Sequence, residues 1–284
     1  MIDELVGQGA DALREAGVQT ARLDAELLLQ HALGLNRSEF LTLGNVELSP
    51  AERDVYFSLI ERRCAREPLQ YITGEAAFRN LILRVTPDVL IPRPETELVV
   101  GEVIFAVKHM NKPKILDIGT GSGAIAIAVA SEVPEAKVVA TDISNAAVAL
   151  AIENAETAGV TDRIRFLVSN YFGSLPSEYE ESFNVVVSNP PYVSASEMSG
   201  LMPEVRDYEP AIALTPGRES LEPHRKIAAE APRFLKTGGL LVLEVGAGTG
   251  DGGKEALTAT GHYREIELIL DLAGQDRIVK GVLK

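Results

Sequence analysis

The sequence predicts an α/β protein in which a bundle of helices precedes a mostly parallel, doubly wound sheet that ends in an antiparallel pair. Three observations indicate this architecture. Apolar residues have helical spacing over residues 1–72, and short apolar runs alternate with helical stretches from residue 113 onward. The last two apolar runs are joined only by LAGQD, which is long enough for a hairpin but not for a parallel crossover.

The first block of the chain reads as helices. In ARLDAELLLQHALGL the apolar positions recur at i, i+3 and i+4, including Leu23 and Leu27. A second helix is expected to begin at Ser49 as its N-cap, with Pro50 in the first turn, and to run as far as Pro68. The stretch GNVELSP between the two predicts a turn. Residues 1–72 are therefore expected to form a small helical bundle.

The pattern changes over residues 71–89, where short β-branched and apolar runs are broken by Gly74 and Pro87. This pattern predicts a hairpin that bridges two domains. Pro92 and Pro94 then predict a rigid extended segment, and a helix is expected to follow it directly.

Strands and helices alternate in the remainder of the chain, which is typical of a parallel sheet covered on both faces. The expected strands are 114–119, 137–143, 164–170, 183–189, 239–246, YREIELILD (263–271) and RIVKGVL (277–283). The expected helices are 122–132, 144–158, 222–236 and 250–260.

Composition excludes several classes of protein. The formal net charge of −14 argues against a phosphate-binding surface, so no direct contact with nucleic acid is expected. The single cysteine, Cys64, excludes a disulfide framework and a cysteine-based zinc site, and it is expected to be an ordinary buried or half-buried residue. No signal peptide or membrane span is expected, so we predict a cytoplasmic protein. We also expect a monomer and no metal site.

A glycine loop in ILDIGTGSGAIAIAVA places Gly119, Gly121 and Gly123 between a strand and a helix. Glycine there allows a ligand to approach the backbone closely, and Asp142 at the end of the next strand can accept hydrogen bonds from a ribose. The spacing is G-x-G-x-G rather than G-x-G-x-x-G, and Asp117 precedes it, which favours a cationic ligand over a pyrophosphate. The loop resembles the first motif of class I methyltransferases, which bind S-adenosylmethionine. The alternative is a tight turn without a ligand.

A second glycine-rich stretch, GTGDGGKE (248–255), fits the phosphate-binding pattern G-x-x-x-x-G-K. Its last position is Glu255, where a Ser or Thr hydroxyl should bind Mg²⁺, and Asp251 adds a negative charge inside the loop. A flexible strand-to-helix connection is therefore the preferred interpretation.

The stretch FNVVVSNPPYVSASE ends an apolar strand in Asn189, Pro190, Pro191 and Tyr192. The Asn189 side-chain oxygen and the Pro190 carbonyl can each accept one hydrogen of a planar NH₂ group, and Tyr192 can stack on its flat face. The end of this strand is expected beside the glycine loop. The motif suits adenine N6, cytosine N4 and the side-chain amide of glutamine, and a proline-rich turn is the structural alternative.

Several stretches together resemble the peptide chain release factor glutamine-N5 methyltransferase family. They are REPLQYITGEAAF, VTPDVLIPRPETELVV, ILDIGTGSGAIAIAVA, VVVSNPPYV, YEPAIAL and DLAGQDRIV. The resemblance implies a helical substrate-docking domain (1–72), a hairpin linker (73–90) and a Rossmann-like class I methyltransferase domain with a seven-stranded sheet (91–284). It implies methyl transfer from S-adenosylmethionine, which leaves S-adenosylhomocysteine, to the Gln of the Gly-Gly-Gln loop in bacterial class I release factors.

The resemblance also implies roles for individual residues. Asn189, Pro190 and Tyr192 would be catalytic, and these three with Pro191 would hold the substrate amide. Arg93 and Glu97 would either close over the cofactor or form interdomain ion pairs. The implied cofactor-binding residues are Gly119, Thr120, Gly121, Ser122, Gly123, Asp142, Tyr171 and Asn189.

The chain departs from the family pattern at three places. Asn170 stands where Asp is common, although its oxygen can still accept from adenine N6. The loop AGTGDGG replaces a stretch that often contains Gln. His224 occupies a position where an aromatic is commoner, and it is expected on a helix surface without a catalytic role.

Three other functions compete with this one. A ribosomal-protein glutamine methyltransferase would share the chemistry and the motifs. A DNA adenine methyltransferase would need a basic cleft and a target-reading domain, for which the acidic sequence offers no sign. A binding-only protein would be expected to have a damaged glycine loop or to lack Asn189.

Overall fold

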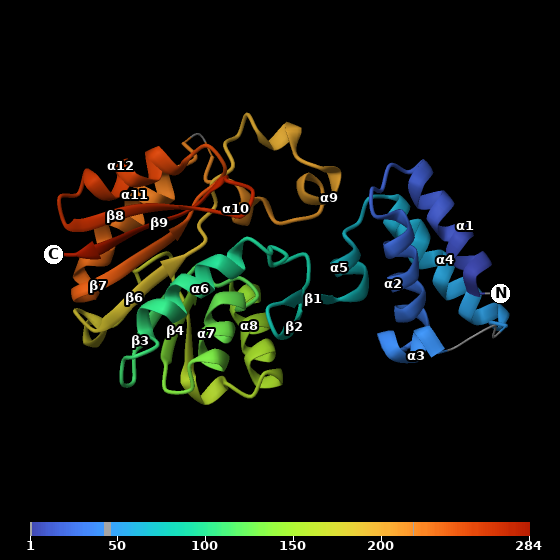
Figure 1. Ribbon diagram of the computed structural model, residues 1–284, viewed down its shortest axis with the longest axis horizontal. Coiled ribbons are helices and arrows are strands. Elements are labelled where there is room, and N and C mark those ends of the chain that lie inside the picture. Colours follow the sequence, from blue (N-terminus) through green and yellow to red (C-terminus); the bar gives the residue numbers. More distant parts are fainter. Residues whose placement is uncertain (1, 43–46, 218) are drawn as a thin grey trace. The chain divides into compact units, whose positions relative to one another are not determined.

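The computed structural model describes residues 2–42, 47–217 and 219–284, and the chain divides into two compact units. The first, helical unit comprises Met1–Glu75 together with Met202–Tyr208. The second unit comprises Ala76–Leu201 and Glu209–Lys284 and contains the sheet (Figure 1).

The helical unit packs around one apolar core. Ser49 caps a helix as expected, because its hydroxyl accepts from the Glu52 N–H while the Glu52 carboxylate accepts from the Ser49 N–H. Tyr56 is fully buried and donates its hydroxyl to the Leu5 carbonyl at 3.3 Å. Residues 44–46 of the turn expected over 44–50 lie outside the described residues. The helices are α1 Ile2–Glu15, α2 Ala21–Leu33, α3 Arg37–Thr42, α4 Pro50–Cys64 and α5 Leu69–Thr73, with the short α9 Pro203–Arg206.

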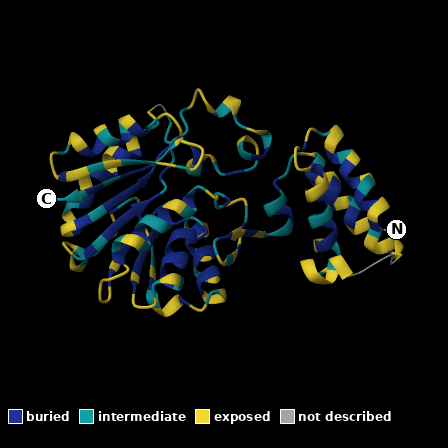
Figure 2. Cartoon of the chain, in the orientation of Figure 1, coloured by how far each residue is buried: buried dark blue, intermediate teal, exposed yellow. Residues whose placement is uncertain are grey.

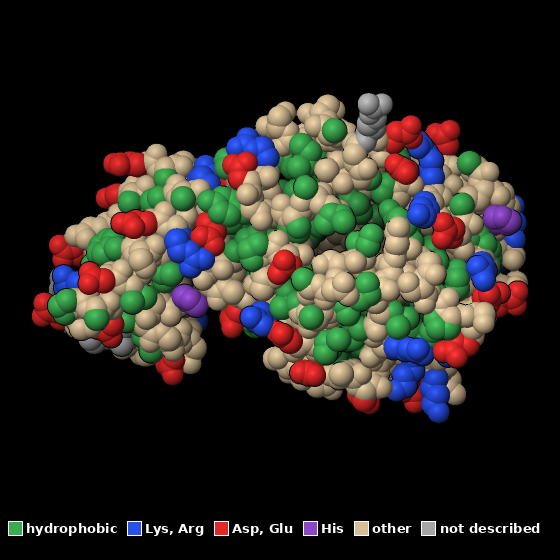
Figure 3. All heavy atoms as spheres, turned by 180° about the vertical axis from the view of Figure 1, so that it is seen from behind, with side chains coloured by type: hydrophobic (Ala, Val, Ile, Leu, Met, Phe, Trp, Pro, Cys, Tyr) green, Lys and Arg blue, Asp and Glu red, His purple; other side chains and the backbone are tan. Residues whose placement is uncertain are grey.

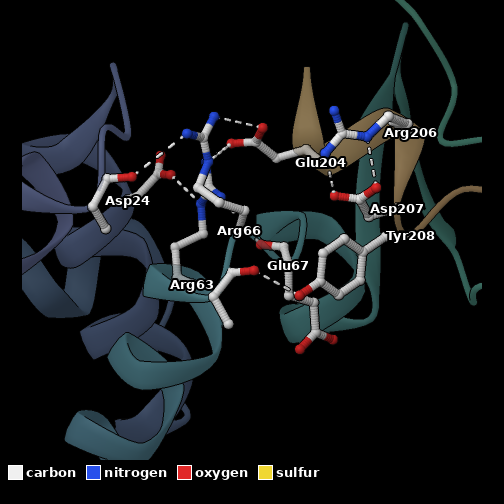
Figure 4. Close-up of polar contacts among 10 residues, drawn as sticks. Asp24, Arg63, Arg66, Glu67, Glu204, Arg206, Asp207 and Tyr208 are labelled. Atoms are coloured by element: carbon white, nitrogen blue, oxygen red, sulfur yellow. Dashed lines mark hydrogen bonds and ion pairs between the residues drawn. The ribbon is translucent and has the colours of Figure 1, made fainter. Parts of the chain in front are cut away.

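A buried ionic cluster binds the 202–208 segment to the rest of the helical unit (Figure 4). Arg63 donates to Asp24 at 2.8 Å and to Glu204 at 3.0 Å, and Arg66 donates to both Glu204 oxygens at 2.7 and 2.6 Å. Tyr208 donates to the Ala65 carbonyl at 2.7 Å. Because Glu204 is only 9% exposed, removing its arginine partners would leave a buried charge unpaired.

The second unit contains the seven-stranded sheet, in the order β5-β4-β3-β6-β7-β9-β8. The five strands from β5 to β7 are parallel, and β9 pairs antiparallel with both β7 and β8, as the short LAGQD link predicts. The strands are β3 Lys114–Ile118, β4 Lys137–Asp142, β5 Ile164–Val168, β6 Phe183–Ser188, β7 Leu235–Glu244, β8 Tyr263–Leu270 and β9 Asp276–Leu283. A separate hairpin pairs β1 Glu75–Phe78 with β2 Leu81–Arg84.

Helices cover both faces of this sheet, and alternate residues of each strand enter different cores. Ile115 packs in the core that contains α6 and α7, whereas its neighbour Leu116 packs in the core that contains α11 and α12. Figure 2 shows the central strands as mostly buried, with exposed residues concentrated on the outer helix faces and in loops. The helices are α6 Thr96–Val107, α7 Ala124–Glu132, α8 Asn145–Thr157, α10 Ala211–Leu214, α11 Glu222–Glu230 and α12 Gly250–Thr258.

The structure corrects some expectations. Leu69–Thr73 is helical, so the hairpin begins only at Glu75. His224 was expected on a helix surface but is fully buried, because it shares a helix face with the buried Ile227 and Ala228. Its Nε2 lies 2.8 Å from the Glu244 carbonyl oxygen, and burial lowers its pKa to about 4. Cys64 is half-buried, as expected.

Among the described residues, no helix is long and apolar enough to cross a membrane. Acidic and basic side chains are interspersed on the face drawn in Figure 3.

Candidate active site

Strand register places the two sequence motifs at one edge of the sheet. β3 and β6 are parallel neighbours in which Ile118 pairs with Ser188, and the Ser188 hydroxyl donates to the Ile118 carbonyl at 2.7 Å. The next residues, Gly119 and Asn189, therefore leave the sheet side by side. This is the position, beyond the carboxyl ends of parallel strands, at which open α/β sheets bind ligands.

A pocket opens at this edge, and most of the predicted site residues line it. Glu97, Gly123 and Tyr192 are the predicted residues that do not. The predicted residues that line the pocket are Gly119, Thr120, Gly121, Ser122, Asp142, Tyr171, Asn189, Pro190 and Pro191.

The glycine loop exposes its backbone to this pocket. Gly119 and Gly121 have φ values of 72° and 56°, in the left-handed region that favours glycine. A Cβ at either residue would have no neighbouring atom within 4 Å, so the space beside them is open. The Gly119 and Thr120 N–H groups both donate to the Thr141 carbonyl, at 2.8 and 2.9 Å, which fixes the loop to β4.

Gly123 has a different role from the other two glycines. It is the N-cap of α7 with φ of 87°, and a Cβ there would lie 2.7 Å from Ile127 Cδ1 and 3.2 Å from Ala151 Cβ. Glycine is therefore required at this position for close packing as well as for its backbone conformation.

Asp142 holds the loop and faces the pocket at the same time. Its Oδ2 accepts from the Gly121 N–H at 2.9 Å, and its Oδ1 accepts from the Ser144 N–H at 2.9 Å. Each carboxylate oxygen can accept more than one hydrogen bond, so capacity is left for the hydroxyls of a ribose.

Asp117 lies beneath the loop rather than in the pocket. It is fully buried, and its Oδ2 accepts from the Thr120 hydroxyl at 2.7 Å. Burial raises its pKa to about 7. The sequence predicts that this carboxylate favours a cationic ligand, but in the structure it supports the loop through Thr120.

Tyr171 lines the pocket from the end of β5, next to the exposed Asn170. Its φ of 52° is unusual for a residue with a side chain. Ser169 stabilises this turn, because its hydroxyl donates to the Tyr171 carbonyl and accepts from the Ser174 N–H, both at 2.9 Å. The Lys226 ammonium lies 4.5 Å from the centre of the Tyr171 ring.

Asn189 is fixed by two buried residues. Its Nδ2 donates to the Thr96 hydroxyl oxygen at 3.2 Å, and the Thr96 hydroxyl donates to Glu244 Oε2 at 2.7 Å. Thr96 is 5% exposed and Glu244 is 1% exposed.

Two family models and many known proteins match this chain. The PrmC N-terminal domain model matches residues 4–74, and the methyltransferase small domain model matches residues 101–204. Release factor glutamine methyltransferase of Moorella thermoacetica is 39% identical over 96% of this chain and 95% of its own length. That of Cereibacter sphaeroides is 40% identical over 97% of this chain and 99% of its own length. This chain belongs to the release factor glutamine methyltransferase family. It is therefore an S-adenosylmethionine-dependent methyltransferase, as the sequence predicted.

Solved structures confirm the fold of this family member. The hMettl16 catalytic domain, in a complex with an RNA hairpin, matches with a TM-score of 0.58 at 15% identity over 78% of this chain and 81% of its own. A methyltransferase from Pyrococcus furiosus matches with a TM-score of 0.51 at 20% identity over 72% of this chain and 90% of its own. At these identities the likeness establishes the α/β methyltransferase fold alone.

The pocket of this methyltransferase fits its cofactor. Two glycines open the backbone beside the first strand, and Asp142 and Asp88 place carboxylates in the lining. Apolar side chains such as Ile125 and Ile143 line the same pocket and suit a flat adenine. S-adenosylmethionine would thus lie along the glycine loop with its ribose at Asp142.

Arg93 and Glu97 have separate roles. Arg93 lines the pocket and forms an ion pair with the buried Glu209 at 2.5 Å. Glu97 does not line the pocket; its carboxylate accepts from the Arg79 N–H at 2.8 Å and so stabilises the turn of the β1-β2 hairpin. Both contacts lie within the second unit, so neither is an interdomain ion pair.

Tyr192 does not line the pocket and lies against Gly246, which follows β7. A Cβ at Gly246 would lie 2.9 Å from the Tyr192 ring, so glycine there leaves room for the ring. Burial raises the pKa of Tyr192 to about 12, which keeps its hydroxyl protonated.

Sequence reasoning missed several residues of the site. Asp88, Thr96, Ile212 and Ala213 line the pocket, but no role was assigned to any of them. The stretches VTPDVLIPRPETELVV and YEPAIAL, which contain all four, carried part of the family resemblance and could have directed attention to them.

Proposed function

We propose that this enzyme methylates the side-chain amide nitrogen (N5) of the Gln in the Gly-Gly-Gln loop of bacterial class I peptide chain release factors. One observation carries the proposal: Asn189 and Pro190 leave the sheet beside the open glycine loop and line the same pocket. The relatives that match nearly the whole chain are named release factor glutamine methyltransferases, which supports a release factor glutamine as the acceptor.

The amide nitrogen of the acceptor is a weak nucleophile, so the main task of the protein is to position it. When bound, S-adenosylmethionine supplies a reactive methyl group on a positively charged sulfur. Asn189 Oδ1 and the Pro190 carbonyl accept the two hydrogens of the acceptor amide and aim its nitrogen into the pocket. Pro190 and Pro191 restrict the backbone, so the carbonyl is held in place before the acceptor binds. No general base is needed, because the amide proton becomes acidic only after methylation.

Three segments of the chain divide the work in this proposal. Residues 1–72 dock the release factor, residues 73–90 link, and residues 91–284 bind the cofactor and carry out the transfer. Asn189, Pro190 and Pro191 hold the acceptor amide, whereas Tyr192, which the sequence also assigned to it, lies against Gly246 outside the pocket lining. The enzyme works as a cytoplasmic monomer without touching nucleic acid directly.

The acceptor can be tested with purified enzyme, labelled S-adenosylmethionine and an unmodified release factor, with the methylated residue mapped by mass spectrometry. We expect methyl on the Gly-Gly-Gln glutamine and none on a factor in which that Gln is replaced by Ala. Transfer to a ribosomal protein or to DNA instead would keep the chemistry and overturn the acceptor.

The amide clamp can be tested with Asn189→Ala. We expect kcat to fall by about 100- to 1,000-fold, while the Kd for S-adenosylmethionine changes less than about threefold. Asn184→Ala is the matched control, because Asn184 lies at the opposite end of β6 and its side-chain oxygen accepts from Lys114 N–H and Lys236 Nζ. Full turnover by the Asn189 variant would exclude the clamp.

A further inference from the structure

The Asn189 carboxamide has two ends of nearly equal size but opposite hydrogen-bonding character. Its oxygen accepts and its nitrogen donates. Only the oxygen can take a hydrogen from an acceptor NH₂ group. The proposed reaction therefore requires that the oxygen, and not the nitrogen, be turned toward the acceptor.

The neighbours of Asn189 determine which end faces the protein. A threonine hydroxyl has one hydrogen, and the Thr96 hydrogen is directed to Glu244 Oε2 at 2.7 Å. The Thr96 oxygen can then only accept from Asn189. Within the carboxamide only Nδ2 donates, and it lies 3.2 Å from Thr96 Oγ1. Asn189 Oδ1 is left on the other side of the group.

The carboxylate end of this chain of hydrogen bonds is itself held in place. Glu244 is the last residue of β7, and its carbonyl accepts from His224 Nε2 at 2.8 Å. Because a carbonyl only accepts, this bond places the imidazole proton on Nε2. Both Thr96 and Glu244 are almost completely buried, so water does not compete for their hydrogen bonds.

We propose that Thr96 and Glu244 are positioning residues that fix the orientation of the Asn189 carboxamide, so that Oδ1 faces the acceptor amide. The inference rests on the proposed function and deepens it. Loss of the Thr96 hydroxyl would allow the Asn189 carboxamide to rotate by about 180°, so that its nitrogen could face the acceptor. Protonation of Glu244 would have the same effect, because a carboxylic acid can donate to Thr96 and the Thr96 hydrogen can then bond to Oδ1.

The proposal implies a pH dependence of turnover. Burial raises the pKa of Glu244 to about 7, while the Thr96 hydrogen bond and nearby arginines oppose this rise. We expect kcat to fall as the pH drops through about 7 and the carboxylate is lost. The charged or titratable groups around Glu244 are Arg277, Arg93, Glu95, His224 and Tyr192.

Thr96→Val tests the hydroxyl directly, because valine keeps the shape of threonine and removes only the hydrogen bonds. We expect kcat to fall about 10- to 100-fold with a nearly unchanged Kd for S-adenosylmethionine. Thr96→Ser should recover activity to within a few-fold of wild type. Thr157→Val, on an exposed part of α8, controls for the exchange itself. Wild-type kcat in a folded Thr96→Val protein would overturn the proposal.

Glu244→Gln provides a second test that does not depend on the stability of Thr96→Val. Glutamine keeps an oxygen for the Thr96 hydroxyl but cannot be charged. The variant should therefore remain active at pH 8, and its kcat should no longer decrease as the pH drops through about 7. Asp117→Asn should keep that fall, although the pKa of Asp117 is also about 7, because Asp117 bonds to Thr120 and not to Thr96. A decrease of kcat below about pH 7 in Glu244→Gln that equals the wild-type decrease would contradict the proposal.

A measurement without turnover separates this inference from the choice of acceptor. The ¹⁵N side-chain amide signals of Asn189 should shift between pH 6 and 8 in the wild type and stay constant in Glu244→Gln. If the wild type methylates no release factor but these signals titrate, the proposed acceptor is wrong, and the positioning of Asn189 by Thr96 and Glu244 is supported. If the signals do not titrate, the positioning of Asn189 by Thr96 and Glu244 is excluded.

Discussion

Two glycine-rich loops follow strands of the same sheet and lead into helices, yet they differ in what their glycines do. In the first glycine loop (residues 119–123), Gly119 and Gly121 border open space in the pocket. In the second glycine loop (residues 246–253), a Cβ at Gly250, Gly252 or Gly253 would lie 2.6, 2.3 or 2.9 Å from a neighbouring side-chain atom. Glycine leaves the space beside the first loop open, whereas in the second it lets neighbouring side chains pack closely.

The packing of the second glycine loop corrects one expectation. The sequence predicts a flexible strand-to-helix connection over 248–255 and a helix over 250–260. The helix Gly250–Thr258 confirms the second prediction, and its first turn lies against Leu221, Leu268 and Val279, so most of the stretch is packed helix rather than a flexible connection. The sequence pattern alone does not separate the two loops, because a glycine count carries no information about the neighbouring space.

The comparison extends to the carboxylates beneath the loops. Asp117 precedes the first loop and Glu244 precedes the second; both are buried, and burial raises both pKa values to about 7. A carboxyl group that ionises near pH 4 when unfolded and near pH 7 when folded stabilises the fold fully only below about pH 4. That contribution is lost as the pH rises to about 7.

The largest expected effect is therefore on stability as a function of pH. Removing the charge by Asp117→Asn should flatten the decline in the free energy of unfolding between pH 4 and 7 by on the order of 4 kcal/mol. Glu244→Gln should flatten it by a similar but smaller amount. Denaturant titrations at several pH values measure both, and a decline as steep as wild type in either variant would show that its carboxyl is not protonated in the fold.

Adding one methyl group to each loop should give the next largest effect. Gly253→Ala should lower the free energy of unfolding by about 2 kcal/mol, because its Cβ would crowd Val279 and Val245, and should leave cofactor affinity unchanged. Gly121→Ala should cost about 1 kcal/mol through backbone strain but weaken cofactor binding. Thermal unfolding and calorimetric titration of both proteins check this, and a weaker affinity in Gly253→Ala than in Gly121→Ala would reverse the comparison.

The smallest effect concerns two aspartates with the same local contact. Asp142 accepts from the Gly121 N–H, and Asp276 accepts from the Gly250 N–H, both at 2.9 Å. Only Asp142 lines the pocket, so Asp142→Ala should raise the Kd for S-adenosylmethionine about tenfold, a loss of about 1.4 kcal/mol, and Asp276→Ala should not. Equal effects would remove Asp142 from the ribose site.

Much of the fold could be predicted from local patterns. The strand order along the chain, the two-faced burial and the antiparallel end follow from apolar spacing and from the length of one link. The burial of His224 could not, because it depends on which face of α11 meets the sheet. Thr96 also lacked a local signal, since its partners Asn189 and Glu244 lie 93 and 148 residues away.

The placement of residues 202–208 in the helical unit affects how this enzyme can be taken apart and recombined. The chain passes between the units after residues 75, 201 and 208, so no single cut separates them. A chimera that takes its first 75 residues from a relative would place a foreign surface against the native Glu204. Exchange of the helical unit should therefore succeed only when the short internal segment is transplanted with it, so this protein contains a domain that two separate stretches of its gene must encode together.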